Sequence, residues 1–437
     1  MQNNTSTIPN PPTLTRSQIV KACLVCFASS LFFFYEFFQL NMFNSINQAL
    51  LKEFHFSAEQ LGRLSAYYFY ANVLFLFPAG LILDRVSTRK ALLVAMLTAV
   101  SCTTVFAHTS TIWVADLCRF LTGISSTFAF LSCLRLASRW FPTKYLALVI
   151  GLIVTIAMLG GMVAQTPMTV LTDALGWRNA LRIAAGFGLV LWLLIFLFVQ
   201  DYPENGEQSL NKYHKPLTTT RLWTSLKRAF INRQNWLSGV YTSLMNLPIF
   251  LLGAMWGSLY LVQIHHLTDT QASEIVSMIF VGTIVGAPAI GLLSDRLGRR
   301  KLPMIVFSIL SLAVIFPIIY LPQITPAIGM LLFFLLGFFT SSQVISYPVI
   351  AESNPLEITA TASAIASVLI MGGGVMQPVF GWFMGLHWDH HLLNGVPLYS
   401  LSDYRLALWM MPIAFLIALL ATLPLKETRC MAQEFKS

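Results

Sequence analysis

The sequence predicts an all-α integral membrane protein of twelve transmembrane helices, arranged as two pseudo-symmetric six-helix bundles. Of its 437 residues, 56% are hydrophobic and only 10% are charged, whereas an ordinary soluble protein has about 25% charged residues. The apolar residues form runs of about 20 or more, the length that a helix needs to cross a bilayer. A glycine-rich motif also occurs twice, as GGMVAQ at 160–165 and GGGVMQ at 372–377.

The apolar runs divide evenly around a polar and basic interruption at 201–235. The expected spans are 19–46, 61–83, 90–108, 111–138, 145–171, 178–200, 236–263, 272–293, 302–321, 326–350, 358–385 and 404–425. We therefore predict a disordered tail at 1–18, a first bundle at 19–200, a linker at 201–235, a second bundle at 236–425 and a tail at 426–437.

The basic residues predict the orientation of these helices. The segments that connect successive spans lie on alternate sides of the membrane. All 27 Lys and Arg residues fall on one of these two sides, apart from Lys52, Arg63, Arg119, Arg178, Arg182 and Arg405. Because Lys and Arg accumulate in cytoplasmic loops, both termini and the linker are predicted to be cytoplasmic. The membrane is predicted to be the inner (plasma) membrane of a bacterial-type cell. The net charge of +9 thus reports topology and does not indicate a nucleic-acid partner.

Two loops form a second internal repeat. GLILDRVSTRK at 80–90 follows the second span, and GLLSDRLGRRK at 291–301 follows the eighth. The offset of 211 residues nearly equals the 212 residues that separate the two glycine-rich motifs. The chain is therefore interpreted as a duplication.

The pattern G-x-x-x-D-R-x-G-x-R-[RK] resembles the signature loop of the major facilitator superfamily, although Ser87 stands where that family usually has Gly. The resemblance implies two bundles that rock around a site at the membrane midplane. Gly80 and Gly291 are expected to let helices approach closely. Contacts of these loops are expected to form in one access state and break in the other. The gating candidates are Gly80, Asp84, Arg85, Arg89, Gly291, Asp295, Arg296, Arg299 and Arg300.

Charged residues inside spans are candidates for coupling transport to protons, because a charge in the membrane is costly and usually functional. Glu36 lies among aromatic residues in the first span, and Asp116 and Arg119 lie in the fourth. The fragment Arg119-x-x-x-Gly123 resembles the family motif whose Arg is associated with proton coupling. Arg119 is expected to pair with Glu36, or with Asp116 one turn away. Asp116 could instead sit in the outer headgroup layer as an ordinary ion-pair partner.

Neutral polar and aromatic residues on the expected cavity-lining spans are candidates for substrate contact. Gln165 and Gln377 end the two glycine-rich motifs. Each carries a side-chain amide that needs a hydrogen-bond partner if it is buried. Substrate contact and bonding between helices are both open for these two side chains. The full candidate set is Tyr35, Gln39, Gln165, Tyr241, Asn246, Trp256, Tyr260, Gln343 and Gln377.

The predicted function is secondary active transport of a small polar organic solute by alternating access, as proton-coupled uptake. The phrases FFFYEFFQLNMF, RWFP, GWR and WGSLYL loosely resemble phagosomal amino-acid transporters of intracellular bacteria and the lysosomal dipeptide-transporter-like branch. That resemblance favours an amino acid or short peptide. Alternatives are a proton-antiport exporter of a siderophore or drug, and a membrane receptor on a fold that no longer transports.

Several other functions are not indicated by the sequence. No phosphate-binding loop and no nucleophile–base arrangement stands out, so neither an enzyme nor a cofactor is predicted. HWDHH at 387–391 is interpreted as a loop and not as a metal site, because it lacks a clear fourth ligand. The expected partners are the solute, protons and membrane lipid, with the chain acting as a monomer.

Overall fold

The computed structural model describes residues 16–141, 143–203, 227–393 and 395–431. The first six spans comprise α1 (Arg16–Asn41), α2 (Phe43–Phe54), α3 (Ala58–Arg85), α4 (Thr88–His108), α5 (Ile112–Trp140), α6 (Thr143–Val163), α7 (Thr166–Leu175) and α8 (Trp177–Phe198). The last six comprise α11 (Arg233–Met245), η1 (Ile249–Trp256), α12 (Gly257–His265), α13 (Asp269–Leu297), α14 (Lys301–Tyr320), α15 (Pro326–Thr340), η2 (Ser341–Ile345), α16 (Ser346–Glu352), α17 (Leu356–Gly373), α18 (Met376–Gly385), α19 (Leu401–Leu408) and α20 (Met410–Thr422). A short antiparallel hairpin, β1 (Leu392–Leu393) with β2 (Val396–Pro397), precedes α19.

The described residues contain 12 segments that are long and apolar enough to cross a membrane, from Arg16–Asn41 to Leu401–Thr422. The predicted number of spans is therefore confirmed. The structure adds interruptions that hydropathy does not reveal. The first span ends as α1 at Asn41 and continues as α2, the seventh contains the π-helical turn η1, and the tenth contains the 3-10 turn η2.

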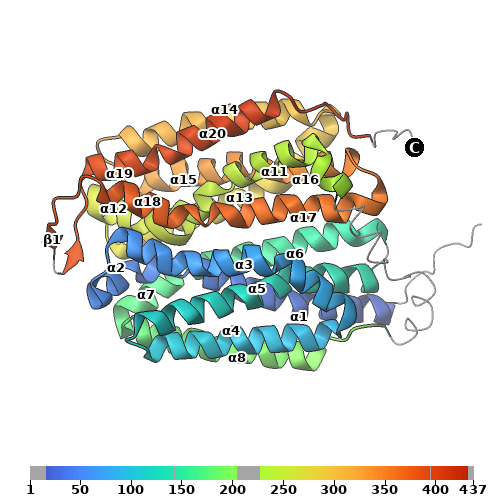
Figure 1. Ribbon diagram of the computed structural model, residues 1–437, viewed down its shortest axis with the longest axis horizontal. Coiled ribbons are helices and arrows are strands. Elements are labelled where there is room, and N and C mark those ends of the chain that lie inside the picture. The colour runs from blue at the N-terminus through green and yellow to red at the C-terminus, as the bar shows by residue number, and fades with distance from the viewer. Residues whose placement is uncertain (1–15, 142, 204–226, 394, 432–437) are drawn as a thin grey trace, which may run out of the picture.

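The spans pack as two halves, which appear in Figure 1 as a blue-to-green layer and a yellow-to-red layer. In the first half, α5 packs against α1, α3 and α4, while α4 also packs against α8. In the second half, α13 packs against α15, α11 against α17, and α14 against α20. The predicted tail at 1–18 and linker at 201–235 fall largely on residues outside those described, so the domain limits remain predictions.

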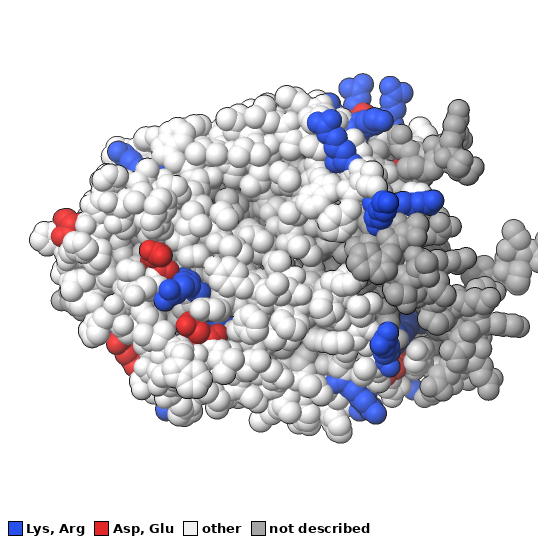
Figure 2. All heavy atoms as spheres, in the orientation of Figure 1, with Lys and Arg blue, Asp and Glu red and all other residues white. Residues whose placement is uncertain are grey.

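The two ends of the molecule differ in charge. The described ends of the chain lie at the same end (Figure 1), and Lys and Arg gather there on the side that Figure 2 shows. We call this end the basic face. The opposite end, which carries α2 and the β hairpin, is called the far face. Acidic side chains are visible toward the far face in Figure 2.

Glycines permit close contacts between helices, but not at every predicted position. A Cβ on Gly161 would collide with the ring of Phe280, and a Cβ on Gly374 would collide with the ring of Phe69. Both contacts join the two halves, as expected for the repeated glycine-rich motif. A Cβ on Gly80 or Gly291 would meet nothing within 4 Å. The expected close helix approach at these two loop glycines is therefore wrong for this conformation.

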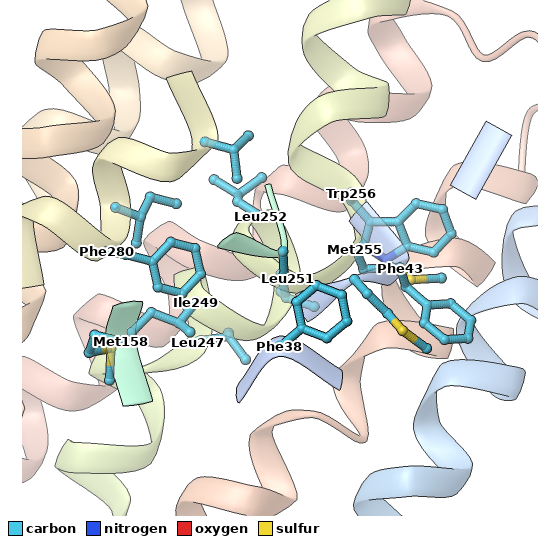
Figure 3. Packing of buried hydrophobic residues seen from close by; sticks show 14 of the residues in the cluster. Phe38, Phe43, Met158, Leu247, Ile249, Leu251, Leu252, Met255, Trp256 and Phe280 are labelled. Carbon is cyan, nitrogen blue, oxygen red and sulfur yellow. The ribbon is translucent and has the colours of Figure 1, made fainter. Parts of the chain in front are cut away.

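The apolar core between the halves forms around η1. Figure 3 shows Leu251, Met255 and Trp256 of η1 packed near Phe38 and Phe43 of the first half. The side chains of η1 are buried along its whole length. This turn contacts α1 and α2 of the first half and α18 of its own half, so it is part of the contact between the halves.

Candidate transport site

A buried carboxylate, a tyrosine and a guanidinium lie together in the first half. Glu36 on α1 and Arg119 on α5 are each only 2% exposed. The Tyr68 hydroxyl on α3 donates to Glu36 Oε2 at 3.3 Å, while Glu36 Oε1 has no hydrogen-bond partner among the described residues. Tyr68 was not among the sequence candidates, because a lone tyrosine in an apolar span carries no distinguishing pattern.

Arg119 is held by the backbone and by aromatic faces. Its Nη1 donates to Gln39 O at 3.1 Å, and its guanidinium lies 4.5 Å from the ring centre of Phe43 and 4.9 Å from that of Tyr68. Within the described chain, Arg119 Nε and Nη2 have no hydrogen-bond partner. Two buried donors of a cation are thus unsatisfied.

The structure places both Glu36 and Arg119 against Tyr68, without a direct ion pair between them. The Tyr68 hydroxyl faces the carboxylate, and its ring faces the guanidinium. Asp116 is partly buried and interacts electrostatically with Arg63. No ion pair between Asp116 and Arg119 occurs among the described residues. The predicted pairings are therefore absent in this conformation, although Glu36 and Arg119 share one neighbour.

Two first-span candidates point toward α4. The amide of Gln39 donates to Thr103 Oγ1 at 2.9 Å, and the Tyr35 hydroxyl contacts the same oxygen at 3.4 Å. Both side chains are buried. In this conformation, Tyr35 and Gln39 therefore bond within the first half.

The two repeated glutamines both donate to carbonyl oxygens of η1. Gln165 Nε2 donates to Gly253 O at 2.8 Å, and Gln377 Nε2 donates to Phe250 O at 2.9 Å. Gln165 reaches η1 from the other half, whereas Gln377 lies in the same half. Gln377 Oε1 has no described partner. Of the two roles left open for these amides, bonding between helices is the one that this conformation displays.

Asparagines of α2 extend this contact. Asn44 Nδ2 donates to Gln165 Oε1 at 2.5 Å and to Ser258 Oγ at 2.7 Å, and Asn44 Oδ1 accepts from Ser258 N at 3.0 Å. Asn47 Nδ2 donates to Met255 O at 2.9 Å. Asn44 and Asn47 were missed by sequence reasoning. Their spacing of three residues, which starts at Asn41, was the available signal.

The remaining second-half candidates are buried and bonded within that half. Gln343 Nε2 donates to Asn246 Oδ1 at 2.8 Å, and Trp256 Nε1 donates to Gln377 O at 3.3 Å. The Tyr241 hydroxyl contacts Ser342 Oγ at 2.8 Å, and the Tyr260 hydroxyl donates to Ile318 O at 2.5 Å. Tyr241 and Tyr260 thus fix helices of the second half in this conformation.

The signature loops make their described contacts inside their own halves. In the second half, Arg300 Nη1 lies 2.5 Å from Asp295 Oδ1, and Arg300 Nη2 lies 2.8 Å from Glu352 Oε1. In the first half, Arg89 N donates to Asp201 Oδ1 at 3.0 Å. Arg85, Arg296 and Arg299 are exposed, and the side chain of Asp84 lies outside the described part of the structure. The described contacts hold helix ends together, and the gating role remains a prediction.

No group of three or more His, Cys, Asp or Glu side chains in the described ranges is arranged to hold a metal ion. In the loop at 387–391, His391 Nε2 lies 3.6 Å from Asp389 Oδ2, and both side chains are largely exposed.

Comparison with known proteins identifies related transporters. The sequence model of the Major Facilitator Superfamily matches residues 29–376 and 239–430. The probable galactarate/D-glucarate transporter GudP of Escherichia coli is 22% identical over 74% of this chain and 78% of its own. The lysosomal dipeptide transporter MFSD1 of Danio rerio is 23% identical over 59% of this chain and 58% of its own.

Coverage of other relatives is smaller. The uncharacterised transporter YybO of Bacillus subtilis is 27% identical, but the chain spans only 45% of its length. Among solved structures, an inward-facing, unoccupied bacterial homologue of the human lysosomal transporter Spinster superposes with a TM-score of 0.73 at 15% identity, covering 92% of this chain and 97% of that one. At that identity, the likeness concerns the fold alone.

Proposed function

Because the chain belongs to the Major Facilitator Superfamily, we propose that it takes up a small organic solute together with protons by alternating access. Glu36 is the proposed coupling group, Arg119 the proposed solute-binding cation, and Tyr68 the residue that lies between them. The single observation that carries the proposal is this buried arrangement, in which Glu36 Oε1 and Arg119 Nε and Nη2 have no described partners.

Proton coupling is supported by the surroundings of Glu36. Its carboxylate receives one described hydrogen bond, from Tyr68 at 3.3 Å, and it is almost fully buried. A charged carboxylate inside a membrane protein requires a cation or a proton as its partner. Since Arg119 does not supply a direct ion pair here, proton binding and release at Glu36 can accompany the movement of the halves.

The solute class is supported by Arg119. Its unsatisfied donors call for an anion, and a guanidinium binds carboxylates through two parallel hydrogen bonds. We therefore propose a solute with at least one carboxylate. An amino acid or short peptide, as predicted from the sequence, meets this requirement. The galactarate or D-glucarate named for GudP and the dipeptides named for MFSD1 meet it as well.

The orientation is proposed from charge. We place the basic face, with both termini, in the cytoplasm of a bacterial-type inner membrane, because Lys and Arg favour cytoplasmic loops. The far face is then external. We further propose that the chain functions as a monomer, without a cofactor or an enzymatic activity.

Reconstituted vesicles provide the test. We expect purified protein to accumulate a carboxylate solute, found by screening amino acids, peptides and sugar acids, when the outside is made acidic. Glu36→Gln removes the titratable group, so it is expected to abolish this accumulation while leaving exchange of labelled for unlabelled solute measurable. Glu59→Gln, at an exposed glutamate of the far face, is the matched control and should accumulate normally.

The outcomes separate the alternatives. Accumulation by Glu36→Gln against the solute gradient would place the coupling site elsewhere, with Asp116 as the next candidate. An exporter of a siderophore or drug would expel its solute when the proton gradient is imposed. A receptor on this fold would bind a solute but fail to move it in any vesicle.

A further inference from the structure

An apolar groove lies between α3, α4 and α5, away from the contact between the halves. Its volume is about 330 Å³. Lys90 stands at one end, toward the basic face, and the other lining residues are Ile82, Val86, Ala91, Val94, Ala95, Thr98, Leu121, Ile124, Ser125 and Phe128. Val94 is 66% exposed and Ile82 is 45% exposed. The groove is therefore open at the surface, and its wall is nearly all hydrocarbon.

Lys90 differs from its counterpart in the second copy of the signature loop. Lys301, 211 residues later, donates through Nζ to Leu423 O at 2.6 Å and so caps the end of a neighbouring helix. Lys90 is exposed, and within the described ranges its ammonium makes no hydrogen bond or ion pair. Arg89, beside it, is already engaged with Phe196 O at 2.6 Å. The first copy of the loop therefore leaves one ammonium free at the mouth of the groove.

We propose that this groove binds an anionic phospholipid, with the acyl chain along α4 and the phosphate on Lys90. The distance along α4 from Lys90 to Thr98 is about 12 Å at 1.5 Å per residue, so the groove runs from the headgroup level into the hydrocarbon layer. Basic residues at the membrane surface attract anionic headgroups. An apolar groove that continues from such a residue fits a lipid better than a soluble anion, because a soluble anion has no acyl chain to pack against the hydrocarbon wall.

Thermal unfolding of the full chain in detergent tests this proposal. Phosphatidylglycerol is expected to raise Tm above the value in phosphatidylcholine with the same acyl chains. Lys90→Gln should lose this difference, because the ammonium is removed from an exposed position that makes no internal contact. Ala91→Leu should lose it by filling the groove. Lys426→Gln, at another exposed lysine of the basic face, should retain it.

The results also distinguish other occupants. Equal stabilisation of the parent chain by both lipids, or by inorganic phosphate alone, would overturn the proposed anionic lipid. Retention of the phosphatidylglycerol effect in Lys90→Gln would overturn it as well. If Ala91→Leu is unstable even in phosphatidylcholine, native mass spectrometry replaces it by counting the phosphatidylglycerol molecules bound to Lys90→Gln and to the parent chain. An equal number on the two chains contradicts the proposal.

Discussion

Among the described residues of the first half, Arg119 has the most buried side-chain atoms without a hydrogen-bond partner. A buried cation normally has its donors satisfied, because an unpaired charge in a low dielectric is costly. Here the backbone oxygen of Gln39 and the rings of Phe43 and Tyr68 supply only part of that requirement. A solute carboxylate would supply the rest.

Replacing Arg119 tests this role at the residue scale. Arg119→Lys keeps the charge but loses the planar fork that binds a carboxylate through two bonds. A hydrogen bond to a charged group contributes about 1.5–3 kcal/mol, so KM for the transported carboxylate should rise roughly 10- to 100-fold while the maximal rate is largely retained. Initial-rate uptake in vesicles measures both quantities. Arg63→Lys serves as the control, and an unchanged KM in Arg119→Lys would exclude Arg119 from solute binding.

At the scale of elements, the duplication extends to helix capping. Asp201, after the sixth span, accepts from Arg89 N at the start of α4. Glu427, after the twelfth span, accepts from Arg300 N at 2.8 Å and from Lys301 N at 3.0 Å at the start of α14. Each carboxylate satisfies helix N–H groups that have no partner within the helix. Each half thereby ties its last span to its third.

Glu427 provides a pH-dependent prediction. Partial burial raises the pKa of Glu427, but the backbone N–H groups of Arg300, Arg429 and Lys301 outweigh it and hold that pKa below its ordinary value. Glu427 therefore stabilises the folded state fully when the pH is above its ordinary pKa. This stabilisation is lost as the pH falls through its pKa in the folded state. Glu427→Gln should lower the unfolding free energy by about 0.5–2 kcal/mol, as for loss of a cap.

Thermal unfolding between neutral and acidic pH checks this expectation. The Tm difference between the parent chain and Glu427→Gln should be present at neutral pH and shrink on acidification. Asp389→Asn, in the exposed loop at 387–391 of the far face, should behave like the parent. A difference that is absent at neutral pH, or that grows as pH falls, would show that Glu427 is not a stabilising cap.

The sequence predicted the number of spans but not the π-helical turn in the seventh span or the 3-10 turn in the tenth. Hydropathy reports how apolar a segment is, and Ile249–Trp256 is apolar whether its turn is α or π. The partners of Gln165 and Asn44 were also out of reach, because they lie on η1 and α12, far along the chain. Glu36 and Arg119 were found because charges are rare in spans, whereas Tyr68 has no such contrast with its neighbours.

At the scale of the whole molecule, the halves are joined toward the far face. Six hydrogen bonds between described residues connect them, and all six lie on that side. Asn44 makes two with Ser258, Asn47 bonds to Met255 O, Gln165 to Gly253 O, Gln48 to Asp269, and Ala58 N to the Tyr399 hydroxyl. This conformation is therefore closed at the far face.

Asn44 makes two of these six hydrogen bonds, because its Nδ2 donates to Ser258 Oγ and its Oδ1 accepts from Ser258 N. Asn44→Ala removes the two hydrogen bonds to Ser258 that join the halves, and also the one to Gln165 Oε1, which lies within the first half. At about 0.5–1.5 kcal/mol for each of the two net hydrogen bonds between the halves, the balance should shift toward a far-face-open state by on the order of tenfold. Asn179→Ala, at an exposed amide of α8, is the control.

Distances between spin labels on the two faces report whether the two halves alternate around the Glu36 site. The six native cysteines are replaced, and labels are placed at Glu59 and Leu386 for the far face and at Val86 and Leu297 for the basic face. We predict that Asn44→Ala, or acid with the carboxylate solute, lengthens the far-face distance while shortening the basic-face distance, and that Glu36→Gln removes the response to acid. Two distances that stay fixed, or that change in the same direction, would show that the halves do not alternate around this site.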